Sequence, residues 1–218
     1  LVLSKDNATV SEDGTVSDNF SVVLRSEPSA KVTLSASDND SSEVSFSPSS
    51  LVFGSGNWSV SQVITLTGLD DNVSDDNQST LLTLSLSSSD GKYDNSSLSA
   101  QTVTVTTSDN DTVDVLISES SLSVGEDGTS DTFTVRLNSE PTSTVLVSMD
   151  LNGSDELSVS DNLSFSPDNW SLFQTVTVTG LDDNVSDDNQ TSVLSVLSSS
   201  SDSKYNGLSD NLSVVTTD

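Results

Sequence analysis

The chain has 218 residues, a formal net charge of -28, no Cys and no His, and about a third of its residues are Ser or Thr. Only six Lys and Arg face 34 Asp and Glu, so nucleic acids and anionic membrane surfaces are poor partners and cations are natural ones. The missing Cys and His exclude disulfides, thiolate metal sites, the usual general base and most zinc sites.

Short apolar runs follow one another along the first half of the chain. They cover residues 20–24, 32–34, 44–53, 58–67, 82–86 and 103–105, and Ser, Asn, Asp, Gly or Pro bounds each of them. Within residues 58–67, Trp58, Val60, Ile64 and Leu66 share one parity, which predicts a strand with these side chains on a core face. About seven such strands in each half predict an antiparallel β-sandwich. Leu, Val, Ile and Phe make up a little more than a quarter of the chain, enough for lean folded cores.

The second half repeats the first with an offset of 112 to 114 residues. A period this long is typical of tandem whole domains rather than of a solenoid. We therefore expect two sandwich repeats, residues 1–111 and 112–218. The junction around residues 108–112 is short and acidic, which favours an end-to-end arrangement of the two repeats.

One string, TGLDDNVSDDNQ, occurs twice without change, at residues 67–78 and 179–190. In the first copy it places Asp70, Asp71, Asp75 and Asp76 in one loop after a core strand, and Glu12 and Asp109 stand at the start and end of the same repeat. Calcium fits such a set because it takes six to eight oxygen ligands and needs neither His nor Cys. The alternative is a solvated acidic turn, in which Asp and Asn serve local turn geometry.

These residues resemble the Calx-β repeats of sodium/calcium exchangers and of very large bacterial surface adhesins. That family opens with a Glu-Gly-type turn, carries an Asp-Asp-x-x-x-Glu loop and closes on an Asp-rich linker. The resemblance implies immunoglobulin-like sandwiches that bind Ca²⁺. It implies as ligands Glu12, Asp70, Asp71, Asp75, Asp109 and Asp111 in the first repeat, and Glu126, Asp182, Asp183, Asp187 and Asp218 in the second.

The sequence also departs from that family pattern. Asp75 and Asp187 stand where the family has Glu. Shorter ligands predict a weak site of the extracellular kind, with a dissociation constant on the order of 0.1 to 1 mM. A further ligand is expected near Asp38 or Asp40, with Asp150 as its counterpart.

The Asn residues form a second pattern, because 14 of the 16 begin the acceptor motif Asn-x-Ser/Thr. This excess predicts N-glycosylation of an extracellular surface, unless it reflects only a turn-rich composition. Asn39, Asn72 and Asn110 lie near proposed calcium ligands and are set aside. Ten of the other eleven are candidates: Asn7, Asn19, Asn57, Asn77, Asn95, Asn152, Asn162, Asn169, Asn189 and Asn211.

We expect no enzyme, because no His, Cys or Gly-rich phosphate loop offers a catalytic group. The sequence favours a structural module of an extracellular fibre or adhesin stalk, stiffened by Ca²⁺ and covered by covalent glycans. Its expected partners are neighbouring copies of the same repeat, in a longer array or a filament, and no membrane insertion is expected. The alternatives are a module that binds a carbohydrate or another ligand, and a calcium sensor.

Overall fold

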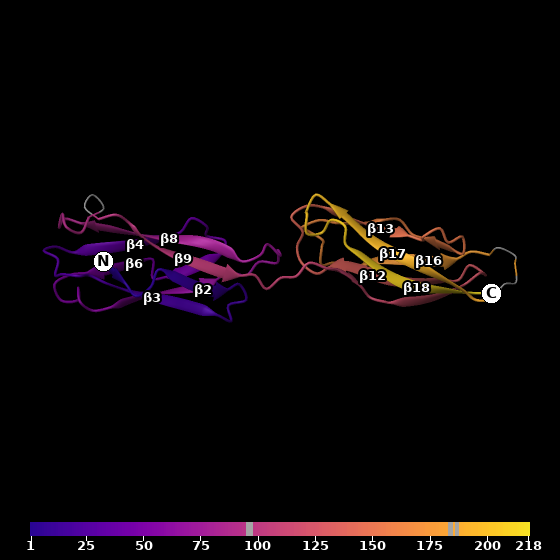
Figure 1. Cartoon of the computed structure of the whole chain (residues 1–218), viewed down its shortest axis with the longest axis horizontal. Coiled ribbons are helices and arrows are strands. Elements are labelled where there is room, and N and C mark those ends of the chain that lie inside the picture. The colour runs from indigo at the N-terminus through magenta and orange to yellow at the C-terminus, as the bar shows by residue number, and fades with distance from the viewer. Residues whose placement is uncertain (95–97, 183–184, 186–187) are drawn as a thin grey trace. The chain divides into compact units, whose positions relative to one another are not determined.

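The computed structural model describes residues 1–94, 98–182, 185 and 188–218. The chain forms two compact units, which we call unit 1 (Leu1–Asp71 and Asp75–Asn110) and unit 2 (Asn72–Ser74 and Asp111–Asp218). Within the described residues each unit contains nine strands and no helix (Figure 1). The expectation of two all-β repeats is confirmed. No helix among the described residues is long and apolar enough to cross a membrane.

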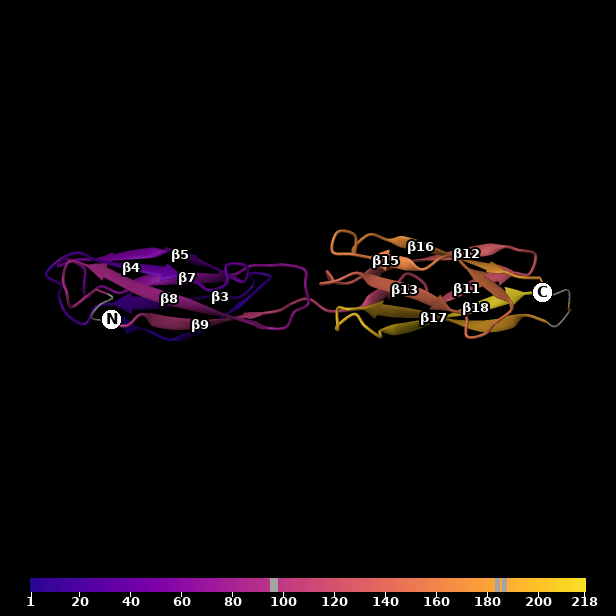
Figure 2. The same cartoon turned by 90° about the horizontal axis from the view of Figure 1, so that it is seen from above.

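Unit 1 is a sandwich of two sheets, whose strands run along the unit in both views (Figure 2). The four-stranded sheet has the order β1 (Val2–Leu3), β3 (Ser17–Val23), β7 (Gln62–Gly68) and β5 (Val44–Ser47). The five-stranded sheet has the order β2 (Asn7–Ser11), β9 (Gln101–Ser108), β8 (Gln78–Ser88), β4 (Val32–Ser37) and β6 (Ser50–Phe53).

Unit 2 repeats both sheets with the same order of equivalent strands. Its four-stranded sheet consists of β10 (Val115–Ile117), β12 (Ser130–Leu137), β16 (Gln174–Gly180) and β14 (Leu157–Val159). Its five-stranded sheet consists of β11 (Ser121–Gly125), β18 (Ser209–Thr217), β17 (Gln190–Ser200), β13 (Val145–Asp150) and β15 (Leu163–Phe165).

The sequence predicted antiparallel pairing, but each unit also contains one parallel pair of strands. In unit 1, β2 runs parallel to β9, and Ser11 faces Ser108 at the end of the pair. In unit 2, β11 runs parallel to β18 in the same way. The first long strand of each unit thus lies against its last strand. The acidic residues that follow both strands therefore leave the sheet side by side.

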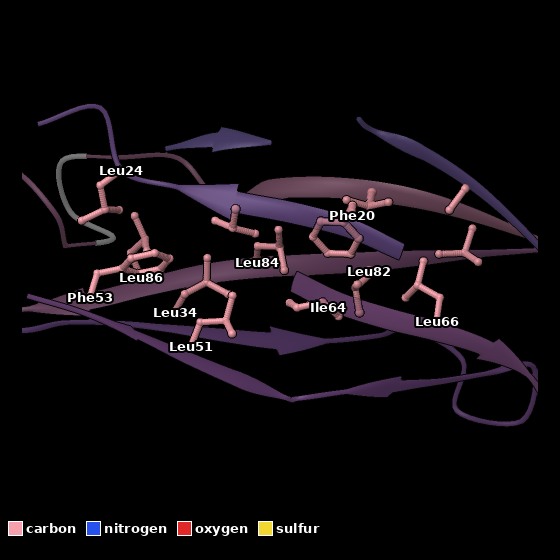
Figure 3. Packing of buried hydrophobic residues seen from close by; sticks show 14 of the residues in the cluster. Phe20, Leu24, Leu34, Leu51, Phe53, Ile64, Leu66, Leu82, Leu84 and Leu86 are labelled. Atoms are coloured by element: carbon pink, nitrogen blue, oxygen red, sulfur yellow. The ribbon is translucent and has the colours of Figure 1, made fainter. Parts of the chain in front are cut away.

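Each unit has its own apolar core between its two sheets. Period-2 alternation supplies it: Leu82, Leu84 and Leu86 of β8 are at most 5% exposed, while the residues between them face outward or are half-buried. Figure 3 shows Phe20 and Ile64 from the four-stranded sheet close to these leucines. Phe133, Phe165 and Leu194 occupy the core of unit 2. The polar composition therefore folds because most of the larger apolar residues of each unit gather between its two sheets.

Residues 44–53, expected as one run, form two strands in different sheets. β5 belongs to the four-stranded sheet and β6 to the five-stranded sheet. Pro48 lies between them, and because proline has no N–H to donate, it interrupts a sheet ladder. The chain crosses here from one layer of the sandwich to the other.

The strand expected over residues 58–67 begins only at Gln62. A turn precedes it, in which the Gly54 N–H donates to Asn57 Oδ1 (2.7 Å) and the Trp58 N–H donates to the Gly54 carbonyl (3.0 Å). Trp58 and Trp170 still pack on the cores, as expected. Val60 and Leu172 do not, because they are 57% and 61% exposed. Strand parity cannot be extended across a turn.

At one end of each unit a buried tyrosine joins two loops. The Tyr93 hydroxyl accepts from the Ser26 N–H (3.1 Å) and donates to the Ser26 carbonyl (2.8 Å). Tyr205 makes the same pair with Ser139, at 3.0 Å and 2.8 Å. These contacts tie the loop after β8 or β17 to the loop after β3 or β12. The contacts of Tyr93 with Ser26 and of Tyr205 with Ser139 thus stabilise the fold.

Candidate metal centre

Five acidic residues of unit 1 gather at the end opposite to this tyrosine, which we call the carboxylate pole: Glu12, Glu43, Asp71, Asp75 and Asp109. Glu12 follows β2 and Asp109 follows β9, and the parallel pairing of these strands places the two residues side by side. The Glu12 N–H continues the ladder by donating to the Ser108 carbonyl (3.2 Å). One sheet therefore delivers two carboxylates to one point.

The other sheet delivers the rest of the set. Val44 of β5 pairs with Gly68 of β7, and the Leu69 N–H donates to the Glu43 carbonyl (3.0 Å). Glu43 therefore lies beside the point where the chain leaves β7 for the loop with Asp71 and Asp75. Carboxylates from both sheets meet at the same pole.

Gly68 lets the two sheets approach each other at this pole. A Cβ built on Gly68 would lie 2.2 Å from the Ser11 carbonyl oxygen and 3.1 Å from the Glu12 nitrogen. At Gly180 in unit 2, the Gly125 carbonyl oxygen would be 2.3 Å away. Only glycine permits backbone contact this close. The glycine in the repeated string thus brings its loop next to Glu12.

Glu12 and Glu43 are buried carboxylates. Glu12 is 2% exposed and Glu43 is 6% exposed. Glu12 Oε2 and Glu43 Oε2 are shielded from solvent and have no hydrogen-bond partner among the residues that the structure describes. Leaving a buried carboxylate oxygen unsatisfied is costly, so such an atom indicates a group that belongs beside it.

Further carboxylates surround Glu12. One carboxylate oxygen of Glu12 and one of Asp109 lie within 4.8 Å of each other. The nearby loop is fixed by hydrogen bonds: the Asp76 N–H donates to Asp109 Oδ2 (2.8 Å), and the Asp109 N–H donates to Asn77 Oδ1 (3.1 Å). Oxygen ligands alone, in this number, suit a hard cation such as Ca²⁺.

The raised pKa values of two glutamates indicate concentrated negative charge at the carboxylate pole, which favours a cation there. Burial, followed by repulsion from Asp109, Asp71 and Asp75, raises the pKa of Glu12 to about 7. Burial, together with Asp75, Asp40 and Asp71, also raises the pKa of Glu43. Asp71 and Asp75 act on both groups, so the glutamates share one cluster.

The structure places the expected ligands unequally. Glu12 and Asp109 lie together, Asp71 and Asp75 lie close enough to act on Glu12, and Asp111 belongs to unit 2. Asp70 is exposed. The sequence predicted an extra ligand at Asp38 or Asp40 and did not indicate Glu43. The repeat itself carries the signal, because Glu43 and Glu156 both directly precede a buried strand residue, Val44 or Leu157.

Unit 2 repeats the backbone hydrogen bonds of the carboxylate pole. The Glu126 N–H donates to the Thr217 carbonyl (3.1 Å), and the Leu181 N–H donates to the Glu156 carbonyl (2.9 Å). Glu126 is 9% exposed, whereas Asp182 and Asp218 are exposed. Asp150, the expected counterpart of Asp38 or Asp40, is also exposed. Asp183 and Asp187 lie outside the described residues. The backbone contacts that position Glu12 and Glu43 thus recur around Glu126 and Glu156.

The fold and the carboxylate pole of unit 1 together define a tandem β-sandwich protein with an oxygen-rich cluster at strand ends, a non-catalytic type of domain. The Calx-beta domain family matches residues 1–111 and 108–217, and the chain belongs to this family. No curated protein matches it.

Several solved structures are similar to the chain. The calcium binding domain CBD12 of CALX1.1 is 18% identical over 90% of this chain and 77% of its own, with a TM-score of 0.39. CBD12 of CALX1.2 is 17% identical over 89% and 77%, with a TM-score of 0.37. The periplasmic chaperone SfaE is 8% identical over 99% of both chains, with a TM-score of 0.38.

Proposed function

We propose that the chain is a calcium-stiffened structural module. The observation that carries this proposal is the pair of buried oxygens, Glu12 Oε2 and Glu43 Oε2, which have no hydrogen-bond partner in the described chain. A divalent cation between the sheets would offset their desolvation and the mutual repulsion of Asp71, Asp75 and Asp109. Membership of the Calx-beta family and the calcium binding domains of CALX support the choice of Ca²⁺.

The bound cation would join the two sheets at the end of each unit. Glu12 and Asp109 would supply ligands from the five-stranded sheet, and Glu43, Asp71 and Asp75 from the four-stranded sheet and its loop. Because calcium binds the folded pole and not the unfolded chain, it raises the free energy of unfolding by mass action. We expect affinity on the order of 0.1 to 1 mM, typical of extracellular modules.

Calorimetric titration and thermal melts with calcium or chelator test this proposal. Calcium should raise the melting temperature, and magnesium should do so less because it demands stricter octahedral geometry. The double variant Glu12→Gln/Glu126→Gln should lose most of the calcium response. Glu27→Gln, an exposed acid in the loop after β3, is the matched control and should keep it. Equal melting temperatures with calcium and with chelator would contradict the proposal.

The same proposal assigns the chain to an extracellular fibre or stalk with neighbouring copies of the repeat and covalent glycans as partners. Its support is the duplication, the frequent extracellular use of Calx-beta domains and the excess of glycan acceptor motifs. Sedimentation velocity in calcium over a range of protein concentrations tests self-association, and intact mass before and after glycan removal tests modification.

A binding module is the second candidate, and one surface feature favours it. Phe173 is 68% exposed, and the Arg136 guanidinium lies 5.4 Å from the centre of its ring. Exposed aromatic rings next to Arg are common in binding surfaces. Phe173→Ala should then abolish binding in a glycan array without lowering the melting temperature, whereas Val63→Ala should change neither.

A further inference from the structure

The acceptor motifs fall into two groups when the two repeats are superimposed through their strand register. Four pairs of Asn occupy equivalent positions in both repeats, and we call them twinned: Asn39 and Asn152, Asn57 and Asn169, Asn72 and Asn184, Asn77 and Asn189. Other motifs are untwinned, because the other repeat carries a different residue. Asn19 corresponds to Thr132, Asn162 to Ser50 and Asn211 to Thr102.

Twinned Asn side chains hold turns together. Asn57 Oδ1 accepts from the Gly54 N–H (2.7 Å), and Asn57 Nδ2 donates to the Val52 carbonyl (3.0 Å). Asn169 repeats both contacts with Ser166 (2.5 Å) and Ser164 (3.3 Å). Both ends of each carboxamide are therefore used by the backbone of the turn before β7 or β16.

Asn152 is engaged even more fully. Its Nδ2 lies 3.0 Å from both the Val193 carbonyl and Ser195 Oγ of β17 and donates to each. Its twin Asn39 makes the corresponding bridge in unit 1, where Oδ1 accepts from the Leu81 N–H (2.6 Å). Both hydrogens of Asn152 Nδ2 thus tie the loop before β14 to the five-stranded sheet.

Three untwinned Asn side chains are open. Asn19, Asn162 and Asn211 are all exposed. Within the described part of the chain, the side chains of Asn19 and Asn162 have no hydrogen bond. Asn211 uses only Oδ1, which accepts from Ser195 Oγ (2.6 Å). At each position the other repeat folds with Ser or Thr, so the fold does not require Asn there.

We propose that Asn19, Asn162 and Asn211 are the N-glycan acceptors of the described chain, and that the motifs at Asn57, Asn152 and Asn169 are structural and remain unmodified. The inference rests on the glycosylation assigned under the proposed function. Asn7 is left out because its Nδ2 already donates to Asp6 Oδ1 (2.9 Å).

The chemistry separates the open sites from Asn152 most clearly. In the transfer, Asn Nδ2 forms a bond to the anomeric carbon of a lipid-linked sugar diphosphate, whose bond to the diphosphate oxygen breaks. The lipid diphosphate leaves with the electron pair, and one Nδ2 proton passes to a base of the transferase. The product keeps a single N–H. Asn19, Asn162 and Asn211 lose no contact, whereas Asn152 must lose one of its bonds to β17.

The test is glycopeptide mapping of the whole chain secreted from a host that carries out N-glycosylation. We expect glycans at Asn19, Asn162 and Asn211 and unmodified peptides at Asn57, Asn152 and Asn169. Glycans at the structural sites, or their absence from the three open sites of a glycosylated protein, would overturn this inference alone. A chain without any glycan would overturn it together with the glycosylation part of the proposed function.

Paired variants separate the two roles of Asn at one motif. Asn57→Gln and Ser59→Ala both destroy the motif, but only Asn57→Gln removes the turn contacts. We expect Asn57→Gln to lower the melting temperature by about 2–4 °C and Ser59→Ala to leave it unchanged, with no change of glycan mass in either. Asn19→Gln and Ser21→Ala should each lose the mass of one glycan and melt alike. Equal melting of Asn57→Gln and Ser59→Ala, or unequal melting of the Asn19 pair, would contradict the assignment.

Discussion

Glu12 is a buried acid. A proton and the proposed calcium ion would compete for its carboxylate oxygens. Its pKa in the folded chain is about 7, above its ordinary value of 4.5. Between these values the folded state binds more protons than the unfolded state, so the free energy of unfolding of the metal-free chain falls as pH rises. This contribution is complete below pH 4.5 and is lost as pH passes through about 7.

We therefore expect opposite pH trends with and without metal. In chelator, the contribution of Glu12 should make the chain less stable at about pH 8 than at about pH 6. Calcium affinity should instead rise over the same interval, because protons compete with the cation for Glu12. Melts and calorimetric titrations measure the two trends. Glu12→Gln should flatten the first slope, and an unchanged slope in that variant would show that Glu12 does not titrate in this range.

Gly68 carries a second residue-scale prediction. Gly68→Ala places a methyl group 2.2 Å from the Ser11 carbonyl oxygen, so β2 and β7 must separate at the carboxylate pole. The free energy of unfolding should fall by about 1–3 kcal/mol, as for other overpacked sites, and calcium affinity should fall with it. Denaturant unfolding and calorimetry measure these changes. Gly54→Ala is the control, since a Cβ there meets nothing within 4 Å.

At the scale of single elements, the tyrosine contacts join loops that no strand pairing connects. Tyr205→Phe would leave the N–H and carbonyl of the fully buried Ser139 without their partner. The free energy of unfolding should fall by about 1–3 kcal/mol, the usual cost of an unsatisfied buried group. Ser203→Ala, an exposed change in the same loop, should cost little. Denaturant unfolding of both variants makes the comparison, and an equal loss in the two would refute the role of the hydroxyl.

Elements were predictable where period-2 alternation alone decides burial. Residues 82–86 and 103–105 lie within β8 and β9 as expected, because nothing interrupts their alternation. Prediction failed at Val60 and Leu172, which lie in a turn held by Asn57 or Asn169 rather than in the strand that follows. It also failed at residues 44–53, where the chain changes sheets. Both errors arise from contacts that a local pattern does not contain.

The candidate site was predictable only in part for a related reason. Composition and the doubled string pointed to Asp71, Asp75 and Asp109, because many carboxylates in a short stretch are visible in a sequence. Glu43 is a single acid next to a strand, and its role depends on the pairing of β5 with β7. Long-range register, rather than local density of charge, brings it to the pole.

The whole molecule carries a net charge of -28, and the self-repulsion of so many acids destabilises a compact chain. In chelator, raising NaCl from about 10 mM to about 500 mM should raise the melting temperature, because the Debye length falls from about 30 Å to less than 8 Å. The gain should shrink at saturating calcium, where the cation has neutralised the poles. A salt response of the same size in both conditions would contradict this view.

The parallel pairing of β2 with β9 has a mechanical consequence. Tension along the chain enters β2 at Asn7 and leaves β9 at Ser108, which lie at opposite ends of the pair. The load therefore acts as shear on all five paired positions at once, from the pair Asn7 and Thr104 to the pair Ser11 and Ser108. It does not separate these pairs one after another. Glu12 and Asp109 stand directly behind the last of these pairs. An ion held between them would resist the sliding of β2 against β9. The parallel pair of β11 and β18 repeats this arrangement in unit 2.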